Sequence, residues 1–528
     1  MATDKTAAAD QDPAETEPDS KADASETSVA DQRPSVWRRV RTWAVRILLL
    51  LLVVVLILAT IVLVRTWRFE SRQPEVTPAP TLEIAVAEAA ERLARSVQHR
   101  TISDDSGASG PEVYARFHQF LQDNYPKVHS ALQREVVATG SLLYTWTGSE
   151  PDRQPIILVG HLDVVPMQPE NADKWTHPPF AGVIADGFIW GRGVLDDKGA
   201  VLGILEAIEW LLGQGFQPRG TIYLAFGHDE ELGGQQGAKA IAALLAQRGV
   251  RAAFVLDEGM FITRGVMKDI DGPLAAVGIA EKGYLTIELI AHAESGHSSI
   301  PPNRTAVGAL AAAIARLETE QMPSRLSGPT QHMLQYLGPE MPFVQRMAMA
   351  NLWLFEPFVR DIFAKKHTTA SLVRTTTAPT MLQAGTKDNV LSATATGVIN
   401  FRILPGDSVA SVLAHVRDVI DDSRIEVKVR LQEEPSPVSD PSSPAFRMLH
   451  RTIREVFDDT VVAPTVMAGM TDARHYVPTT DAIFRFLPLV YGPDDLARLH
   501  GVNERIPVED YGRAIQFYIQ LLRNVQTM

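Results

Sequence analysis

The chain has 528 residues, which is too long for one ordinary domain, and 45% of them are hydrophobic, which is enough to build sizeable cores. Two folded domains with additional segments are therefore expected. Acidic residues outnumber basic ones by 63 to 50, and the formal net charge of −13 argues against a nucleic-acid-binding surface. The sequence contains no cysteine, which excludes disulfides, cysteine-ligated zinc and a thiol nucleophile. Any protein-bound metal must be held by His, Asp and Glu.

The N-terminal region predicts a disordered tail, a membrane span and a linker. Residues 1–36 are acidic and poor in large apolar side chains, a composition that favours disorder. The uncharged run Ile47–Val64 is long enough to cross a bilayer, so we predict a transmembrane helix over 43–65. A buried helix and a cleaved secretory signal are the alternatives. Residues 66–82 include a proline-rich stretch and are predicted to be a linker.

The arginines around this span indicate its orientation. Five precede or enter it and three follow it: Arg33, Arg38, Arg39, Arg41 and Arg46 on one side, and Arg65, Arg68 and Arg72 on the other. Because basic residues favour the cytoplasmic side, we expect a single-pass membrane protein with a cytoplasmic N-terminus and with the chain that follows the span on the extracytoplasmic side.

From about residue 82 onwards the pattern becomes globular. Short apolar runs at 156–159, 221–226 and 253–256 alternate with helical stretches such as 200–212. This alternation is typical of an α/β sheet that is buried on both faces. Polar residues cluster just after the apolar runs, at the sheet edge where sites form in such folds.

The first cluster is His161-Leu162-Asp163, which directly follows an apolar run. One intervening residue sends both side chains to the same side of an extended segment. His161 could then bind a metal, and Asp163 could orient its imidazole. A solvated turn is the alternative for this pair alone.

The second cluster is a glycine-rich loop that delivers two adjacent carboxylates, Asp196 and Asp197, before a helical stretch. A carboxylate that offers both oxygens can bridge two cations, as in two-metal hydrolases. A helix start capped by Asp is an equally good reading of this loop alone.

Two further acidic clusters follow strands, and a histidine lies near the C-terminus. Glu230 and Glu231 are adjacent, so they repel each other unless a cation lies between them; one could bind metal while the other acts as a base on water. A solvated acidic turn is the alternative. Asp257 follows the next apolar run, and His500 precedes an amphipathic stretch over 508–525.

Taken in order, these motifs resemble the zinc-dependent family of aminoacylases, carnosinases, acetylornithine deacetylases and carboxypeptidase S, and the carboxypeptidase S branch fits best. The resemblance covers about residues 85 to 526. The residues that carry it are His161, Asp163, Pro166, Trp175, Pro179, Phe180, Gly182, Asp186, Gly187, Trp190, Gly191, Arg192, Gly193, Asp196, Asp197, Lys198, Gly199, Glu230 and Glu231.

The resemblance implies two zinc ions per chain. By matching positions, one zinc is held by His161, Asp196 and Asp257, and the other by Asp196, Glu231 and His500. Asp163 matches the catalytic aspartate behind the ligands, and Glu230 matches the general base. A cis peptide bond between Asp196 and Asp197 is also implied.

The family architecture implies an α/β aminopeptidase-like catalytic domain with an inserted α+β lid. The boundaries that fit are 83–283 and 435–528 for the catalytic domain and 284–434 for the lid. Within the lid, His297 resembles a histidine that stabilises the oxyanion, and Asn389 and Arg402 resemble residues that hold the substrate carboxylate.

Arg474 lies in a loop that matches the substrate side of the catalytic domain. The sequence departs from the family at Asn400, where Asp is common, at Met470, where a small or amide residue is usual, and at Met260, where the branch often has Gly. These differences bear on the pocket rather than on the reaction.

The sequence therefore predicts a membrane-anchored two-zinc hydrolase that cleaves the amide bond of peptides or N-acyl amino acids with a free C-terminal carboxylate. A dipeptidase of the carnosinase kind is the alternative enzyme. A catalytically silent binding protein on the same fold is the alternative from another class. Family lids often pair, so a homodimer through the lid is possible.

Overall fold

The computed structural model describes residues 36–528 except residues 105 and 268. The predicted disordered tail, apart from Val36, lies outside these residues. The described chain divides into two units, one ending at Ile61 and one running from Val62 to Met528. Helix α1 (Val36–Trp67) begins in the first unit and ends in the second. It is long and apolar enough to cross a membrane, and nearly all side chains of its apolar run are exposed.

The larger sheet has ten strands. It is mixed: β5 pairs in parallel with β8 and β9, and β9 pairs in parallel with β19. The main order is β20-β10-β11-β19-β9-β5-β8-β4-β3, and β18 pairs with β11. The bounds are β3 Gln133–Val137, β4 Ser141–Trp146, β5 Ile156–His161, β8 Ile222–Gly227, β9 Phe254–Asp257, β10 Ile262–Thr263, β11 Leu274–Glu281, β18 Val461–Met467, β19 Ile483–Arg485 and β20 Val490–Tyr491. The three apolar runs identified in the sequence form β5, β8 and β9, so that prediction is confirmed.

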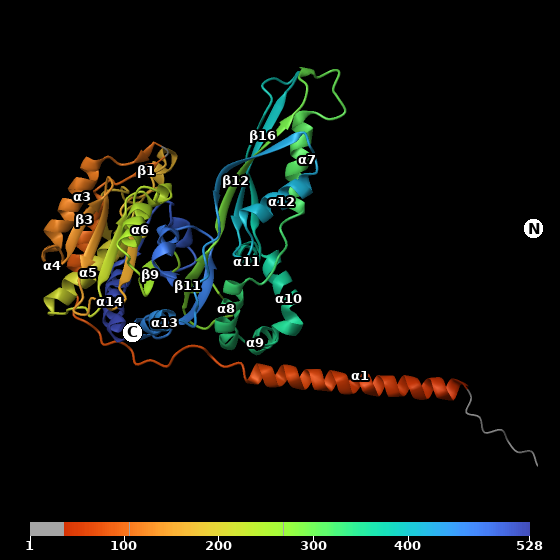
Figure 1. Ribbon diagram of the computed structural model, residues 1–528, viewed down its shortest axis with the longest axis horizontal. Helices are drawn as coiled ribbons and strands as arrows, with labels where there is room; N and C mark the ends of the chain where they lie inside the picture. Colours follow the sequence, from red (N-terminus) through yellow and green to blue (C-terminus); the bar gives the residue numbers. More distant parts are fainter. Residues whose placement is uncertain (1–35, 105, 268) are drawn as a thin grey trace, which may run out of the picture. The chain divides into compact units, whose positions relative to one another are not determined.

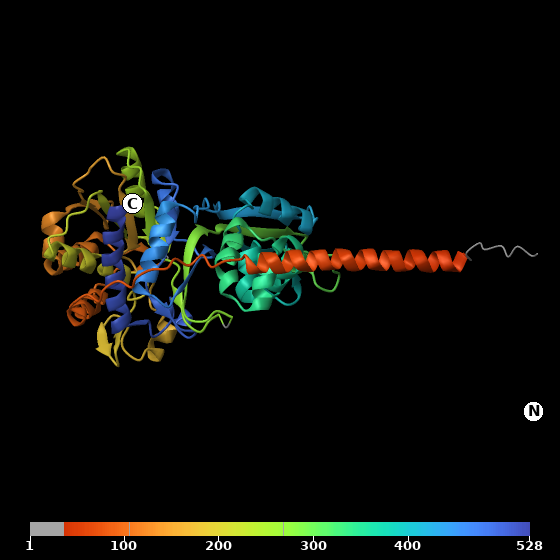
Figure 2. The same cartoon turned by 90° about the horizontal axis from the view of Figure 1, so that it is seen from below.

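Both faces of this sheet are buried, as the apolar runs predicted. In β5, Ile156 and Leu158 pack into one core, whereas Ile157 and Val159 pack into another, because successive side chains of a strand point to opposite faces. Helices α2 (Val86–Val97), α5 (Lys198–Gly213), α13 (Pro444–Val456) and α14 (Val508–Asn524) contribute to the first core, and α6 (Ala238–Gln247) contributes to the second. Figure 2 shows α13 and α14 side by side, in blue. Helices α3 (Pro111–Asn124) and α4 (Pro126–Ala131) also contribute to the first core.

A second, smaller sheet belongs to the predicted lid segment. Its four antiparallel strands run in the order β14-β16-β12-β17. Their bounds are β14 Thr376–Ala384, β16 Thr394–Ile403, β12 Gly283–His292 and β17 Ile425–Glu433. Helices α7 (Ala306–Thr319) and α12 (Val409–Ile420) pack on it and close a separate core (Figure 1). This mixed composition matches the expected α+β lid, while the exact lid boundaries stay a prediction.

The segments by which the chain enters and leaves the small sheet lie next to each other, at the start of β12 and the end of β17. A Cβ atom added to Gly283 would lie 2.6 Å from the carbonyl oxygen of Glu433 and 2.6 Å from the nitrogen of Pro435. Real Cβ atoms do not approach so closely, so only glycine fits where the two connecting segments cross.

A cluster of four helices lies between α7 and β14 in the sequence and is labelled in Figure 1. Its members are α8 Gly328–Leu337, α9 Phe343–Ala350, α10 Leu352–Lys365 and α11 His367–Val373. Helix α8 packs on β18, and its residues Met333 and Leu334 join the core of the larger sheet. This helical cluster is therefore attached to the catalytic sheet even though its sequence falls within the predicted lid segment.

Candidate metal centre

Five loops bring His, Asp and Glu side chains together at one edge of the larger sheet. His161 ends β5, Asp196 precedes α5, Glu230 and Glu231 follow β8, and Glu258 follows β9. The loop before β21 (Arg505–Pro507) adds His500. Strands β5, β8 and β9 run in parallel, so their carboxyl ends meet at the same edge.

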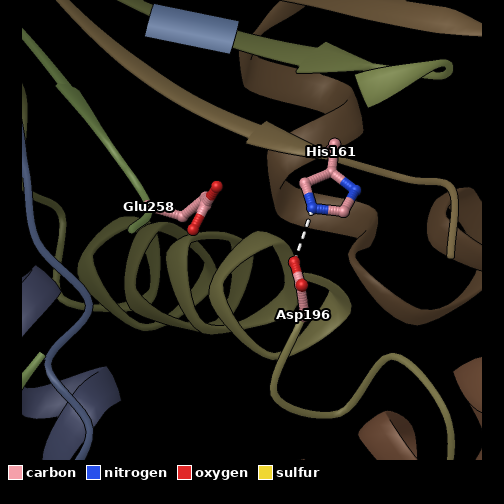
Figure 3. Close-up of side chains that lie close together, drawn as sticks. All are labelled: His161, Asp196 and Glu258. Carbon is pink, nitrogen blue, oxygen red and sulfur yellow. Dashed lines mark hydrogen bonds and ion pairs between the residues drawn. The ribbon is translucent and has the colours of Figure 1, made fainter. Parts of the chain in front are cut away.

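Asp196 is shared by two groups of possible metal ligands. One group is His161, Asp196 and Glu258, and the other is Asp196, Glu231 and His500; the ligand atoms in each lie within 4.8 Å of one another. The Asp196 Oδ1 lies 2.8 Å from His161 Nε2, and its Oδ2 lies 2.9 Å from His500 Nε2. Figure 3 shows the Asp196 carboxylate directed toward His161, and the Glu258 side chain lies beside this pair. One carboxylate that faces two histidines in this way is suited to bridge two ions.

The structure brings Glu258, rather than the expected Asp257, into the first group. Successive residues of an extended segment point to opposite sides, so Asp257 faces away from Glu258. The Asp257 carboxylate accepts hydrogen bonds from the backbone N–H groups of Ala473 (2.7 Å) and Glu258 (2.9 Å). Its oxygens are therefore engaged in holding two backbone segments, and the group of possible ligands that the structure brings together is His161, Asp196 and Glu258.

Asp163 is placed to orient both His161 and the glutamate loop. Its carboxylate lies 3.3 Å from His161 Nδ1, and its backbone carbonyl lies 3.0 Å from the same nitrogen. The carboxylate also accepts hydrogen bonds from the backbone N–H groups of Glu230 (3.1 Å) and Glu231 (3.2 Å). These contacts leave His161 Nε2 directed at Asp196, as expected of a carboxylate behind a metal-binding histidine.

Glu504 supports the loop that carries Asp196, and sequence reasoning missed it. It is fully buried, and its carboxylate accepts hydrogen bonds from Arg192 Nη1 (2.6 Å) and from the backbone N–H groups of Gly193 and Leu195 (both 2.9 Å). The backbone N–H of Asp196 lies 3.3 Å from the same carboxylate. The sequence signal that could have pointed to Glu504 was its position four residues after His500. The peptide bond between Asp196 and Asp197 is cis, which confirms that expectation.

The buried charges favour a cation at this edge. Burial raises the pKa of Glu230 well above its usual range, and the neighbouring Asp472 and Glu231 add to the effect. Burial likewise raises the pKa of Glu258 and of Glu231. Hydrogen bonds to Asp196 and Glu231 raise the pKa of His500 to about 10. Without a metal, protons compensate for the concentrated negative charge.

The donor set fits zinc. Nitrogen from His and oxygen from Asp and Glu are ordinary zinc ligands, and three protein ligands per ion leave a position for water or substrate. Glu231 Oε1 is buried and has no hydrogen-bond partner among the residues that the structure describes. A buried carboxylate oxygen of this kind needs a compensating partner, which a cation would supply.

The predicted substrate-side residues lie in two places. Arg474 Nη2 donates a hydrogen bond to the carbonyl of Gly233 (2.8 Å), directly after the glutamate loop. His297 is exposed on β13 (Gly296–His297), where its Nδ1 lies 2.8 Å from Ser299 Oγ, and Asn389 accepts a hydrogen bond from the Ser298 N–H (3.1 Å). Arg402 lies on β16, half-buried, with its Cζ 4.5 Å from the centre of the Tyr284 ring. Burial lowers the Arg402 pKa.

Among residues 36–528 as described, His297, Asn389 and Arg402 make no hydrogen bond with the residues of the metal centre. The structure therefore brings the metal-binding residues together, whereas these three stay within the small sheet and its loops. Their roles remain predictions.

Comparison with known proteins gives a consistent picture. The family model described as "Peptidase family M20/M25/M40" matches residues 157–524. A relative from Dictyostelium discoideum named "Probable carboxypeptidase S-like 2" is 42% identical over 479 residues, covering 88% of this chain and 92% of the relative. A relative from Xenopus tropicalis named "N-fatty-acyl-amino acid synthase/hydrolase PM20D1" is 40% identical over 479 residues, covering 89% and 93%.

Among solved structures, an M20 family metallo-carboxypeptidase, Sso-CP2 from Sulfolobus solfataricus, superposes with a TM-score of 0.62. The two sequences are 18% identical, and the match covers 84% of this chain and 100% of the other. At this identity the likeness concerns the fold alone.

Proposed function

The chain belongs to peptidase family M20/M25/M40, within its carboxypeptidase S branch, and is a hydrolase; on that premise we propose that it is a two-zinc enzyme that cleaves the amide bond of N-acyl amino acids or peptides with a free C-terminal carboxylate. The observation that carries this proposal is the shared Asp196, whose two oxygens face His161 and His500. The relatives named carboxypeptidase S-like and N-fatty-acyl-amino acid synthase/hydrolase support the substrate class.

His161, Asp196 and Glu258 would hold one zinc ion, and Asp196, Glu231 and His500 the other. When bound, zinc activates water as a nucleophile and polarises a carbonyl oxygen. Asp163 keeps His161 in the orientation that presents Nε2 to the site. These assignments leave Glu230 free of a ligand role.

Glu230 is proposed as the general base that takes the proton from the attacking water. Its backbone N–H is held by Asp163, and its buried carboxyl group has a raised pKa. A general base works best when its pKa lies near the working pH, and a nearby cation lowers the pKa of a carboxyl toward that range. After the amide bond breaks, the same carboxyl group can return the proton to the leaving amine nitrogen.

Recognition of the substrate is assigned to the lid segment. Arg402 is proposed to hold the substrate carboxylate together with Asn389, because a guanidinium binds a carboxylate bidentately. His297 is proposed to donate a hydrogen bond to the oxyanion that develops on the attacked carbonyl. A site built in this way requires lid and catalytic residues to meet on the substrate, and a homodimer through the lid is one way to bring them together.

We also propose that α1 anchors the chain in a membrane as a single span, with the N-terminus cytoplasmic and the catalytic unit on the opposite side. The span has an apolar run of 18 residues, Ile47–Val64, which is about 27 Å of helix. That length matches a hydrocarbon core of about 30 Å. The arginine bias around the span supports the orientation.

A substrate screen with the purified full-length protein, supplied with zinc, tests the proposed reaction. We expect turnover of N-acyl amino acids with medium and long acyl chains, and little turnover of simple dipeptides such as those that carnosinases cleave. The variant Glu230→Gln keeps the shape of the side chain but cannot accept a proton, so it should lose at least about 100-fold in kcat while keeping its zinc content. Turnover of dipeptides alone would favour the dipeptidase reading, and full activity of Glu230→Gln would contradict the assigned base.

A further inference from the structure

Helices α9 and α10 expose an unusual set of large apolar side chains. Leu354, Phe358 and Ile362 are spaced by four residues, so they form a stripe along one face of α10. Phe358 is 69% exposed. The full set, called here the α9–α10 apolar face, is Phe343, Val344, Trp353, Leu354, Phe358 and Ile362. A contiguous exposed apolar surface on a folded domain marks an interaction site.

The same helices hold the last turn of α1. The side-chain amide of Asn351, one residue before α10, donates hydrogen bonds to the Val62 carbonyl and to Thr66 Oγ1, both at 3.2 Å. Arg346 donates to the carbonyl of Phe69 (2.8 Å). Val62 and Thr66 are buried by this packing, unlike the apolar residues that precede them in α1. The end of the proposed span is thus fastened next to the apolar face.

A basic pocket adjoins this junction. Arg65, Arg68 and Arg72 line a cavity of about 480 Å³ together with Met349 and Trp353. Arginine and tryptophan beside an apolar face are typical of segments that lie in the headgroup region of a membrane, where the guanidinium groups meet phosphates and the indole ring lies at the boundary.

We propose that the α9–α10 apolar face lies on the phospholipid bilayer, with Phe343, Phe358 and Ile362 inserted at the boundary between headgroups and acyl chains. This inference rests on the proposed membrane anchor. Thr66 lies two residues beyond the apolar run, so the junction is at the membrane surface. Phe358 lies seven residues beyond Asn351, about 10 Å of helix from this junction.

The bilayer is favoured as the occupant because Asn351, at the start of α10, is hydrogen-bonded to Val62 and Thr66, at the end of the apolar run where the proposed span would leave the membrane. The helical cluster that carries the apolar face is also attached to the larger sheet, because α8 of the same cluster packs on β18. The lid segment and the catalytic sheet would then be held at the surface where amphiphilic acyl substrates concentrate.

The absence of cysteine allows a direct test with single labels. The full-length variants Phe358→Cys, Val136→Cys and Val54→Cys are each labelled with a fluorophore at the single cysteine. Each labelled protein is then reconstituted into vesicles of equal amounts of phosphatidylcholine and phosphatidylglycerol that contain nitroxide-labelled lipids. Val136 is the matched control, because it is exposed on β3, and Val54 reports on the span. We expect nitroxides near the headgroups to quench most of the Phe358→Cys fluorescence and little of the Val136→Cys fluorescence, while deep nitroxides quench Val54→Cys.

Equal quenching at positions 358 and 136, with Val54→Cys quenched, would overturn the inference and leave the anchor standing. Absence of quenching at position 54 would overturn the anchor and the inference with it. Energy transfer between Phe358→Cys labels on different copies, independent of lipid, would identify a second copy as the occupant and also overturn the inference. Zinc content and hydrolysis, measured on the same samples, report separately on the proposed function.

Discussion

At the scale of single residues, the two neighbours Asp257 and Glu258 show how one position decides a ligand set. Asp257 is buried at the end of β9 and Glu258, the next residue, is partly exposed, but only Glu258 lies with His161 and Asp196. Asp257 holds the backbone at Ala473 instead. Residue type alone did not distinguish them, because the direction of each side chain depends on where the strand ends.

This difference predicts the zinc content of two variants. Glu258→Ala should lose one zinc ion per chain, because it removes a ligand from the first group. Asp257→Asn keeps an oxygen that can accept a backbone hydrogen bond, so it should retain two zinc ions. Elemental analysis of the purified full-length variants measures both. Loss of zinc from Asp257→Asn with retention in Glu258→Ala would restore the ligand set expected from the sequence.

A second residue-scale prediction concerns a buried ion pair. Arg485 Nε donates to Glu281 Oε1 at 2.8 Å, and the two side chains are 0% and 2% exposed. Removing one partner leaves a buried charge unpaired, so Arg485→Met should reduce the free energy of unfolding by about 3–5 kcal/mol. The control is Arg248→Met, because the Arg248–Glu135 pair is partly exposed and should contribute at most about 1 kcal/mol. Denaturant unfolding checks both, and similar values for the two variants would contradict the buried pair's importance.

At the scale of elements, the loop between β7 (Phe188–Trp190) and α5 carries the bridging Asp196 but has little regular structure of its own. Its backbone is held by Glu504, which precedes β21, and β21 pairs with β7. The C-terminal segment therefore supplies both the proposed ligand His500 and the support for the loop that carries the proposed ligand Asp196. A sequence pattern could identify His500, but the role of Glu504 depends on pairing across more than 300 residues.

Glu504→Gln should weaken zinc binding without removing a ligand. The amide has one oxygen and one NH2 group, so it cannot accept all the hydrogen bonds that the carboxylate accepts. Residues that support ligands typically change metal affinity by about 10- to 100-fold when replaced, and we expect a change in that range. Glu509→Gln, exposed in the first turn of α14, is the control. Titration with a competing chelator measures the affinity, and unchanged affinity in Glu504→Gln would show that the loop holds without it.

The small sheet carries the prediction on specificity. If Arg402 binds the substrate carboxylate, Arg402→Ala should lose about 10- to 100-fold in kcat/KM on N-acyl amino acids, as expected for a charged hydrogen bond. Carboxyl-amidated analogues, which lack that charge, should be affected far less. Arg430→Ala is the control, because Arg430 lies in the same sheet and pairs with Glu288 at the surface. An equal loss on acid and amide substrates would refute recognition of the carboxylate.

At the scale of the whole molecule, the order and types of the main elements followed from the sequence. Strands β5, β8 and β9, helix α5 and the closing helix α14 lie where the apolar patterns placed them. The α8–α11 helices were less predictable, because their sequence lies within the lid segment while α8 packs on β18. Periodicity indicates a helix and its apolar face, but it does not say which of two sheets that face will meet.

The proposed orientation predicts the outcome of proteolysis. Protease added outside intact cells or spheroplasts should digest the catalytic unit and leave the N-terminal tail protected. Immunoblotting with antibodies against each end checks this, and permeabilised cells serve as the control. Protection of the catalytic unit would reverse the orientation, whereas a mature chain that begins after Trp67 would show that α1 is a cleaved signal.

The position of the small sheet within the chain determines the order in which the protein can fold during synthesis. Strands β18 and β19, His500 and Glu504 all follow it in the sequence, whereas β5, β8 and β9 precede it. At roughly 5–20 residues per second, a ribosome spends about ten to forty-five seconds on the segment between β9 and β19 before these two strands can pair. During that time the nascent catalytic half exposes a sheet edge and lacks the residues that complete its metal centre. The small sheet, whose strands all lie between residues 283 and 433, can fold before β18 and β19 are made, and the half-built catalytic domain is the stage at which chaperones would be needed.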